Sequence, residues 1–123
     1  KAVVGMRIGD IAFAVQNHAE TNGFGVVREL VGHGVGVKLH EKPEVPNYGS
    51  RGRGTMLKTG MTLCIEPMIN LGKRDIIVER DGWTTRTRDG KPSAHFENAV
   101  AVAKGKADIL SDFSIIESVL NQR

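Results

Sequence analysis

The chain has 123 residues, the length of one ordinary domain, and 40% of them are hydrophobic, which is enough to form a core. Its 17 lysine and arginine residues are scattered among 14 acidic ones instead of clustering beside aromatic residues, which excludes a typical nucleic-acid interface. No segment reaches the roughly 20 apolar residues of a membrane-spanning helix, no signal-peptide pattern opens the chain, and the single Cys64 cannot form an internal disulfide. We therefore expect a cytoplasmic protein with neither a membrane nor a specific nucleic-acid partner.

The first predicted element is an amphipathic helix in the segment 8–24. Its apolar residues recur at helical spacing and form one stripe: Ile11, Ala14, Val15 and Ala19. Asp10 is placed to accept hydrogen bonds from the first-turn amides, and Gly23 is placed to end the helix. Because only one stripe is apolar, we expect this helix to cover a sheet.

The rest of the chain is predicted to consist mainly of short strands. A β-rich segment at 24–30 precedes the glycine-rich stretch 32–36, and the segment 41–54 has the composition of an irregular exposed connection. Four further strands are separated by turn sequences that favour hairpins, and they are predicted at 61–69, 75–80, 83–88 and 94–103. Ser114 and Glu117 form a capping-box pattern before a terminal helix. This order of elements indicates an α+β fold.

Strand alternation places two glutamates in unusual surroundings. Glu66 shares a strand face with Cys64 inside an apolar segment, and Glu97 shares a face with His95 and small residues. A carboxylate in such surroundings is costly unless it is paired, protonated or bound to a cation. Together with His33, which lies between glycines, Glu66 and Glu97 suggest a metal site. Mixed imidazole and carboxylate ligands suit zinc, manganese, iron or cobalt.

Each of these residues also has a simpler explanation. Glu66 fits a water-facing charge on an edge strand, and Glu97 fits an ion pair with lysine or arginine across a hairpin. His33 fits a turn residue whose flanking glycines serve a positive φ or a close backbone approach. Trp83 fits hairpin or core packing, and Arg51 fits a solvated loop. Periodicity alone leaves a metal hydrolase as one interpretation among several.

Three ordered motifs carry a more specific signal. They are GHGVGVKLHEKPEVPNY at 32–48, GMTLCIEPM at 60–68 and DGWTTRTRDGKPSAHFEN at 81–98. In order and spacing they resemble the C-terminal half of the type I methionine aminopeptidases, a family of pita-bread metallopeptidases, and the resemblance spans nearly the whole chain. It implies an α+β fold that is half of a pita-bread fold, with a curved antiparallel sheet covered by helices. It also implies that residues 1–123 are the C-terminal half of the catalytic domain, without its N-terminal half.

The resemblance implies roles for single residues. His33, Glu66 and Glu97 would be metal ligands, with Glu97 bridging two divalent ions in the full enzyme, which would be cobalt, manganese, iron or zinc. His95 stands where bacterial members often carry glutamine, and it would lie beside a ligand and tune it. The catalytic residues would be Glu66, which accepts the proton of the nucleophile, and His40, which contacts the scissile peptide and stabilises the oxyanion.

The implied reaction is the hydrolytic removal of an N-terminal methionine from peptides and nascent proteins. Leu39 and Trp83 would bind substrate by walling the methionine pocket, because their apolar character suits a thioether. The family's site also takes two aspartates separated by ten residues, and another histidine, from the N-terminal half. No aspartate pair in this chain has that spacing. We therefore expect the isolated chain to be inactive, and to expose a sheet edge and apolar surface that favour self-association.

Two other functions compete with this one. A proline-specific peptidase related to prolidase or aminopeptidase P would have the same fold, but such members usually follow Glu-Pro with glycine and lack the DGWT hairpin, whereas this chain has IEPM and DGWT. A non-catalytic half that acts as a binding module would keep the pocket without the chemistry. The absence of the aspartates leaves that second alternative open.

Overall fold

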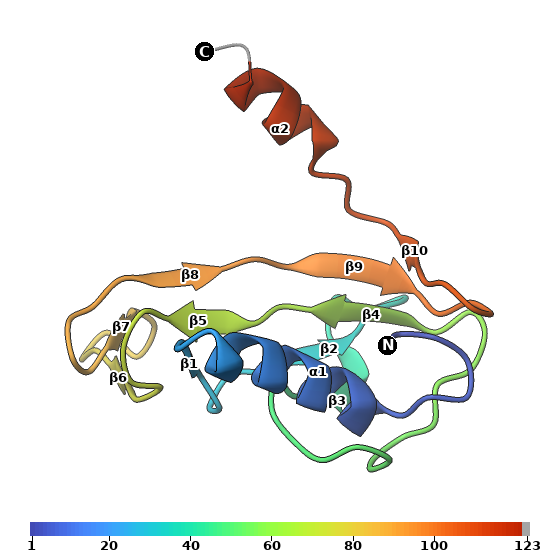
Figure 1. Ribbon diagram of the computed structural model, residues 1–123, viewed down its shortest axis with the longest axis horizontal. Helices are drawn as coiled ribbons and strands as arrows, with labels where there is room; N and C mark the ends of the chain where they lie inside the picture. Colours follow the sequence, from blue (N-terminus) through green and yellow to red (C-terminus); the bar gives the residue numbers. More distant parts are fainter. Residues whose placement is uncertain (122–123) are drawn as a thin grey trace.

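The structure is a computed structural model that describes residues 1–121, and it combines two helices with ten short strands in that part of the chain (Figure 1). The helices are α1 (Ile8–Thr21) and α2 (Ser114–Leu120). The strands are β1 (Gly25–Val26), β2 (Gly32–Gly34), β3 (Glu41–Val45), β4 (Thr62–Ile65), β5 (Met68–Asn70), β6 (Ile76–Val78), β7 (Thr85–Thr87), β8 (Ser93–His95), β9 (Asn98–Ala101) and β10 (Asp108–Ile109). The α+β prediction is confirmed.

All of the strand pairs are antiparallel. The largest sheet has five strands in the order β10-β9-β4-β2-β3, a second has the order β1-β5-β8, and β6 and β7 form a separate hairpin. Figure 1 shows that β4 and β5 follow one another beside β9 and β8, so the first two sheets form one long layer. The β4 strand therefore lies at the centre of the five-stranded sheet, between β9 and β2.

Two predicted strands are each divided in two. The segment 61–69 is interrupted at Glu66 and Pro67, and the segment 94–103 at Phe96 and Glu97. Pro67 has no backbone N–H to donate to a neighbouring strand, which explains the first interruption. Both glutamates that the sequence singles out thus lie where a strand has just ended or is about to begin.

Helix α1 covers one face of the sheet. Its buried residues Ile8 and Ile11 belong to the same core as Leu63, Val100 and Val102 on β4 and around β9. These sheet residues alternate along their strands, so the residues between them face away from α1. The long layer consequently has one face packed against α1 and an opposite face that carries other side chains.

The predicted helix signals are confirmed in part. Asp10 accepts the backbone N–H of Arg7 at 2.8 Å and that of Gly52 at 2.9 Å, so it ties the helix start to a distant loop as well as capping the helix. Gly23 has a φ of +82° just beyond the last turn. Ala14 is only half-buried and lies outside the core, so its inclusion in the predicted apolar stripe was wrong.

Two other local predictions were wrong. The segment 41–54 is not wholly irregular, because it begins with β3, which pairs with β2. Ser114 is the first residue of α2 instead of its cap, and its hydroxyl donates to Asp112 at 2.7 Å. No side chain of α2 is buried, and Figure 1 shows this helix extending away from the sheet, so only α1 covers it. Neither helix is long and apolar enough to cross a bilayer, among the residues described.

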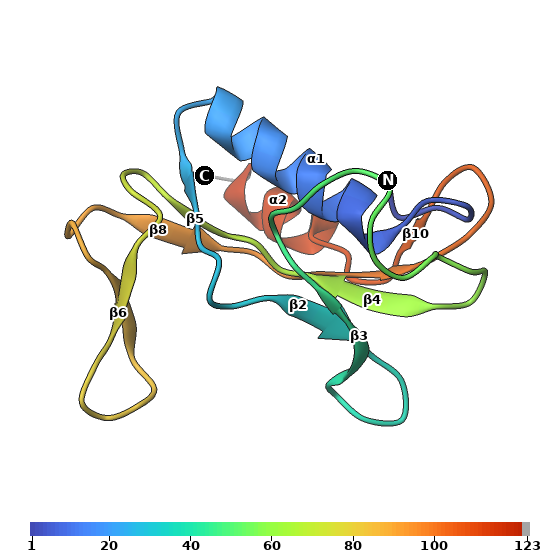
Figure 2. The same cartoon turned by 90° about the horizontal axis from the view of Figure 1, so that it is seen from below.

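Two projections flank the face of the sheet that lies opposite α1. Figure 2 shows the turn between β2 and β3 and the β6–β7 hairpin extending on that side, at different places along the layer. The first turn contains Leu39 and His40, and the tip of the hairpin contains Trp83. Of these segments, the β2–β3 turn directly follows β2, and the β6–β7 hairpin lies nearer the other end of the layer.

Candidate metal centre

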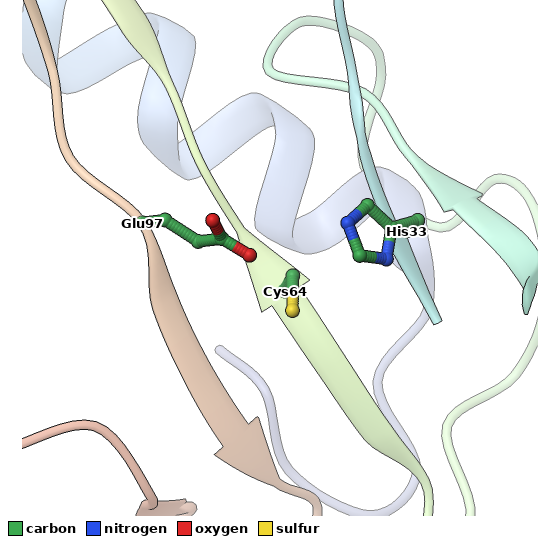
Figure 3. A group of neighbouring side chains, drawn as sticks. All are labelled: His33, Cys64 and Glu97. Carbon is green, nitrogen blue, oxygen red and sulfur yellow. The ribbon is translucent and has the colours of Figure 1, made fainter. Parts of the chain in front are cut away.

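Three side chains that can bind a metal come together on the face opposite α1 (Figure 3). His33 comes from β2, Cys64 from β4, and Glu97 directly precedes β9. One ligand atom from each of the three lies within 4.8 Å of the others. The strand register explains the cluster, because His33 is the direct cross-strand partner of Cys64, and Cys64 is the partner of Ala99, two residues beyond Glu97.

Glu66 joins this cluster through its contacts with two imidazoles. Its Oε1 lies 3.3 Å from Nε2 of His33, and its Oε2 lies 3.2 Å from Nε2 of His95. The Glu66 and His33 side chains are only 16% and 12% exposed. The structure therefore places His33, Glu66 and His95 in one chain of contacts, with the carboxylate at its centre.

The tautomer of His33 makes its contact with Glu66 informative. The Nδ1 atom lies 2.9 Å from the carbonyl oxygen of Gly34, which can only accept, so Nδ1 carries the donated hydrogen. In a neutral ring, Nε2 then presents a lone pair to a carboxylate oxygen. Two acceptors in this position need a proton or a metal cation between them. The donor set therefore fits a divalent cation of the kind that imidazole and carboxylate bind together.

The glycines on either side of His33 allow neighbouring strands to approach closely. A Cβ on Gly32 would collide with the carbonyl oxygen of Cys64, and a Cβ on Gly34 would lie 2.5 Å from the carbonyl oxygen of Lys42. Neither glycine has a positive φ. Of the explanations offered by the sequence, close backbone approach is thus the correct one, and the approaching groups are the adjacent strands.

The Cys64 thiol is the one member of the cluster that the sequence did not identify as a candidate. It is 4% exposed. Burial raises the pKa of this thiol to about 11, and the nearby carboxylates of Glu97 and Glu66 add to the rise. The sequence did contain a signal for this position, because strand alternation over 62–66 places Cys64 on the same face as Glu66.

Of the candidate substrate-binding residues, His40 contacts the cluster directly, and Leu39 and Trp83 are exposed on projecting segments. The rings of His40 and His33 have centroids 4.2 Å apart at an interplanar angle of 62°, so the two imidazoles of the first motif are in contact. Leu39 is 69% exposed in the adjacent turn. Trp83 is 88% exposed at the hairpin tip, so it is not packed in the core of the described chain. Its backbone N–H is held instead by Asp81 at 2.9 Å.

The simpler explanations of the two glutamates do not fit the geometry. Glu66 follows the central strand β4 and is mostly buried against imidazoles, so it is not a water-facing charge on an edge strand. Glu97 is exposed, but it makes no ion pair with lysine or arginine within residues 1–121.

The simpler explanations of two other residues can also be compared with the structure. His33 belongs to a strand, not a turn. Arg51 does lie in a loop, where its guanidinium covers the ring of Phe13 at 4.4 Å.

The sequence is similar to known methionine aminopeptidases. It is 52% identical over 111 residues to the methionine aminopeptidase of Clostridium perfringens, covering 90% of this chain and 45% of that protein. It is 48% identical over 111 residues to methionine aminopeptidase 1 of Bacillus subtilis, with the same coverage. The chain thus spans less than half the length of these relatives.

The fold has the same relatives. The crystal structure of methionine aminopeptidase from Thermotoga maritima matches with a TM-score of 0.85 and 47% identity, over 88% of this chain and 43% of that one. The structure from Rickettsia prowazekii matches with a TM-score of 0.84 and 45% identity, over 87% and 44%. This agreement confirms the prediction of half a pita-bread fold.

The family profile that matches this sequence covers residues 1–104, and so includes every residue of the cluster. A metallopeptidase family implies a divalent metal cofactor, which agrees with the imidazole and carboxylate groups gathered around His33 and Glu66. Sequence, fold and donor set therefore lead to one conclusion: the chain belongs to metallopeptidase family M24.

Proposed function

We propose that this chain carries one half of the catalytic site of a methionine aminopeptidase, which removes N-terminal methionine from peptides and nascent proteins by hydrolysis. The observation that carries the proposal is the convergence of His33, Glu66 and Glu97 on one face of the sheet, in a chain 52% identical to a methionine aminopeptidase. We further propose that residues 1–123 correspond to the C-terminal half of the catalytic domain. The coverage of 43–45% of the relatives supports this assignment.

The proposed metal ligands are His33, Glu66 and Glu97. In the complete enzyme we propose two divalent ions, cobalt, manganese, iron or zinc, with Glu97 as their shared ligand. When bound, such ions polarise the scissile carbonyl and lower the pKa of water. The hydrogen bond from Nδ1 of His33 to Gly34 supports this assignment, because it directs the lone pair of Nε2 towards Glu66.

The chain's own side chains divide the remaining work. Glu66 accepts the proton of the attacking water, and His95 holds the second oxygen of its carboxylate at 3.2 Å. His40, exposed and in contact with the His33 ring, donates to the oxygen that becomes negative as the peptide carbonyl is attacked. Each group thus acts at a separate atom of the reaction.

The methionine side chain is proposed to lie between two projecting segments. The β2–β3 turn, which contains Leu39, and the β6–β7 hairpin, whose tip contains Trp83, extend on the side opposite α1 (Figure 2). Both side chains are large, apolar and exposed here, as expected of pocket walls that need further chain to close around a substrate. The unbranched thioether of methionine suits such a pocket.

The complementary partner is proposed to be an N-terminal half of the same kind of enzyme. The helix α2 buries none of its side chains, and the segment before and within it exposes six large apolar residues: Ile109, Leu110, Ile115, Ile116, Val119 and Leu120. Exposed apolar surface of this kind favours association. We therefore expect the isolated chain to self-associate, and a cytoplasmic location remains a prediction from the sequence.

The test is a fusion protein. In it, the N-terminal segment of the Clostridium perfringens methionine aminopeptidase is joined to the N-terminus of this chain. With manganese or cobalt added, the joined protein is expected to release methionine from Met-Ala-Ser, and the chain alone is not. Glu97→Gln in the joined protein should abolish release. A folded, metal-loaded joined protein that cleaves Xaa-Pro dipeptides but not Met-Ala-Ser would favour the proline-specific alternative. One that cleaves neither would favour the non-catalytic binding module.

A further inference from the structure

The Cys64 side chain lies within the metal-binding cluster. Its Sγ is within 4.8 Å of ligand atoms of both His33 and Glu97, and no other cysteine exists in the chain. Figure 3 shows the three side chains next to one another, His33 on β2, Cys64 on β4 and Glu97 just before β9, with Cys64 in the middle. The sulfur is therefore positioned as a third kind of donor atom beside imidazole and carboxylate.

Core packing does not account for this position. Leu63, the preceding residue, is fully buried in the cluster beneath α1, whereas Cys64, although only 4% exposed, does not belong to that cluster. Strand alternation turns Cys64 to the other face, where it lies beside His33 and Glu97 and opposite Ala99. A small apolar residue would fill this space equally well, but it would offer no donor atom to a metal.

We propose that Cys64 binds the metal as a thiolate together with His33 and Glu97, which gives this chain a preference for zinc or cobalt over manganese. The inference rests on the proposed metal centre and adds sulfur to its donors. On binding, the thiol proton leaves to solvent and the metal takes its place on sulfur. Thiolate ligands favour zinc, while carboxylate and water suit manganese. The exposed Glu97 side chain can rotate to complete the contact.

The experiment is a cobalt titration of the purified chain, followed by near-ultraviolet and visible absorption. Coordination by Cys64 is expected to produce a thiolate-to-cobalt charge-transfer band that grows to one equivalent of metal. Because the chain has a single cysteine, such a band has only one possible origin. In Cys64→Ser the band should be absent while the weaker visible cobalt bands persist, because His33 and Glu97 remain.

Zinc and manganese affinities give a second readout. Competition with a chelator should show zinc binding weakened about tenfold or more by Cys64→Ser, as expected for loss of a group at a metal site, while manganese binding changes much less. Circular dichroism checks that each variant is folded. Should the serine variant fail to fold, Cys64→Thr offers a β-branched replacement suited to a strand, and the spectrum of the unmodified chain is decisive without any variant.

The outcomes separate this inference from the proposed function. Cobalt bound without a charge-transfer band would overturn the role of Cys64 and leave the His33, Glu66 and Glu97 centre in place. No cobalt bound at all would overturn the role of Cys64 in this chain, while methionine release by the joined protein would still decide the proposed function. Equal weakening of zinc and manganese in Cys64→Ser would overturn the proposed metal preference.

Discussion

The Oε2 atom of Glu66 lies 3.2 Å from Nε2 of His95, so the carboxylate that faces His33 is also held by an imidazole from β8. Groups that orient a metal ligand in this way typically contribute about 10- to 100-fold to metal affinity. We expect His95→Ala to weaken zinc binding by that factor, measured by chelator competition. His95→Gln, which can still donate to Glu66, should recover most of the loss. His18, which is exposed on α1, supplies the control, because His18→Ala should leave the zinc affinity unchanged.

The packing beneath α1 predicts that replacing a leucine by alanine lowers the free energy of unfolding at one position and not at another. Leu63 is fully buried against the helix, whereas Leu39 is 69% exposed in the β2–β3 turn. Leu63→Ala should lower the free energy of unfolding by about 2–5 kcal/mol, because it removes buried methyl groups and leaves a cavity. Leu39→Ala should change it by less than about 0.5 kcal/mol. Urea denaturation of both variants measures the difference, and similar losses would contradict the described packing.

The close approach of β2 and β4 makes Gly32 irreplaceable in a way that Gly36 is not. A Cβ on Gly32 would meet the rigid backbone carbonyl of Cys64, whereas one on Gly36 would meet only the end of the flexible Glu41 side chain at 2.8 Å. Gly32→Ala should therefore destabilise the chain by about 1–3 kcal/mol, the usual cost of overpacking, and weaken metal binding with it. Gly36→Ala should have little effect on either. Thermal melting with and without zinc compares the two variants.

Asp10 gives a pH-dependent contribution to stability. Backbone N–H groups of Arg7 and Gly52 donate to its carboxylate and lower its pKa below the ordinary value of 3.8. The unfolded chain therefore binds this proton more tightly than the folded one, so Asp10 stabilises fully above pH 3.8 and loses this effect as the pH falls through its folded-state pKa.

Asp10→Ala should lower the melting temperature at neutral pH, and the gap to the unmodified chain should narrow as the pH falls below 3.8. The exposed Asp108 accepts no side-chain hydrogen bond in the described part of the chain, so Asp108→Ala is the matched control. A gap for Asp10→Ala that stayed constant down to the lowest pH would show that the carboxylate charge is not responsible.

Much of the site could be predicted because β alternation is a local rule. The period of two placed Glu66 and Cys64 on one face of their strand, and Glu97 and His95 on one face of another. In the structure these two faces lie side by side, with Cys64 near Glu97 and Glu66 near His95. The contact between Glu66 and His33 could not be predicted in the same way. It depends on β2 pairing with β4, and pairing between strands distant in sequence is not fixed by periodicity.

The failed predictions have related causes. The strand β3 lies in a segment rich in proline and glycine, and it forms because β2 offers it an edge, a tertiary effect that outweighs composition. The Ser114 hydroxyl was expected to cap α2, but Asp112 competes for it locally. The alternative of core packing for Trp83 does not hold in the described chain, because the β6–β7 hairpin projects away from the sheet, a placement that the turn sequence does not specify.

The three clustered side chains also lie far apart along the chain, at positions 33, 64 and 97, each on a different stretch of the sheet. An ion held by them closes two long loops, and closing such loops restricts the unfolded chain. Metal binding and formation of the sheet are then one coupled equilibrium. An apparent dissociation constant for this chain consequently reports how firmly β2, β4 and β9 are assembled as well as how well the donor atoms suit the ion.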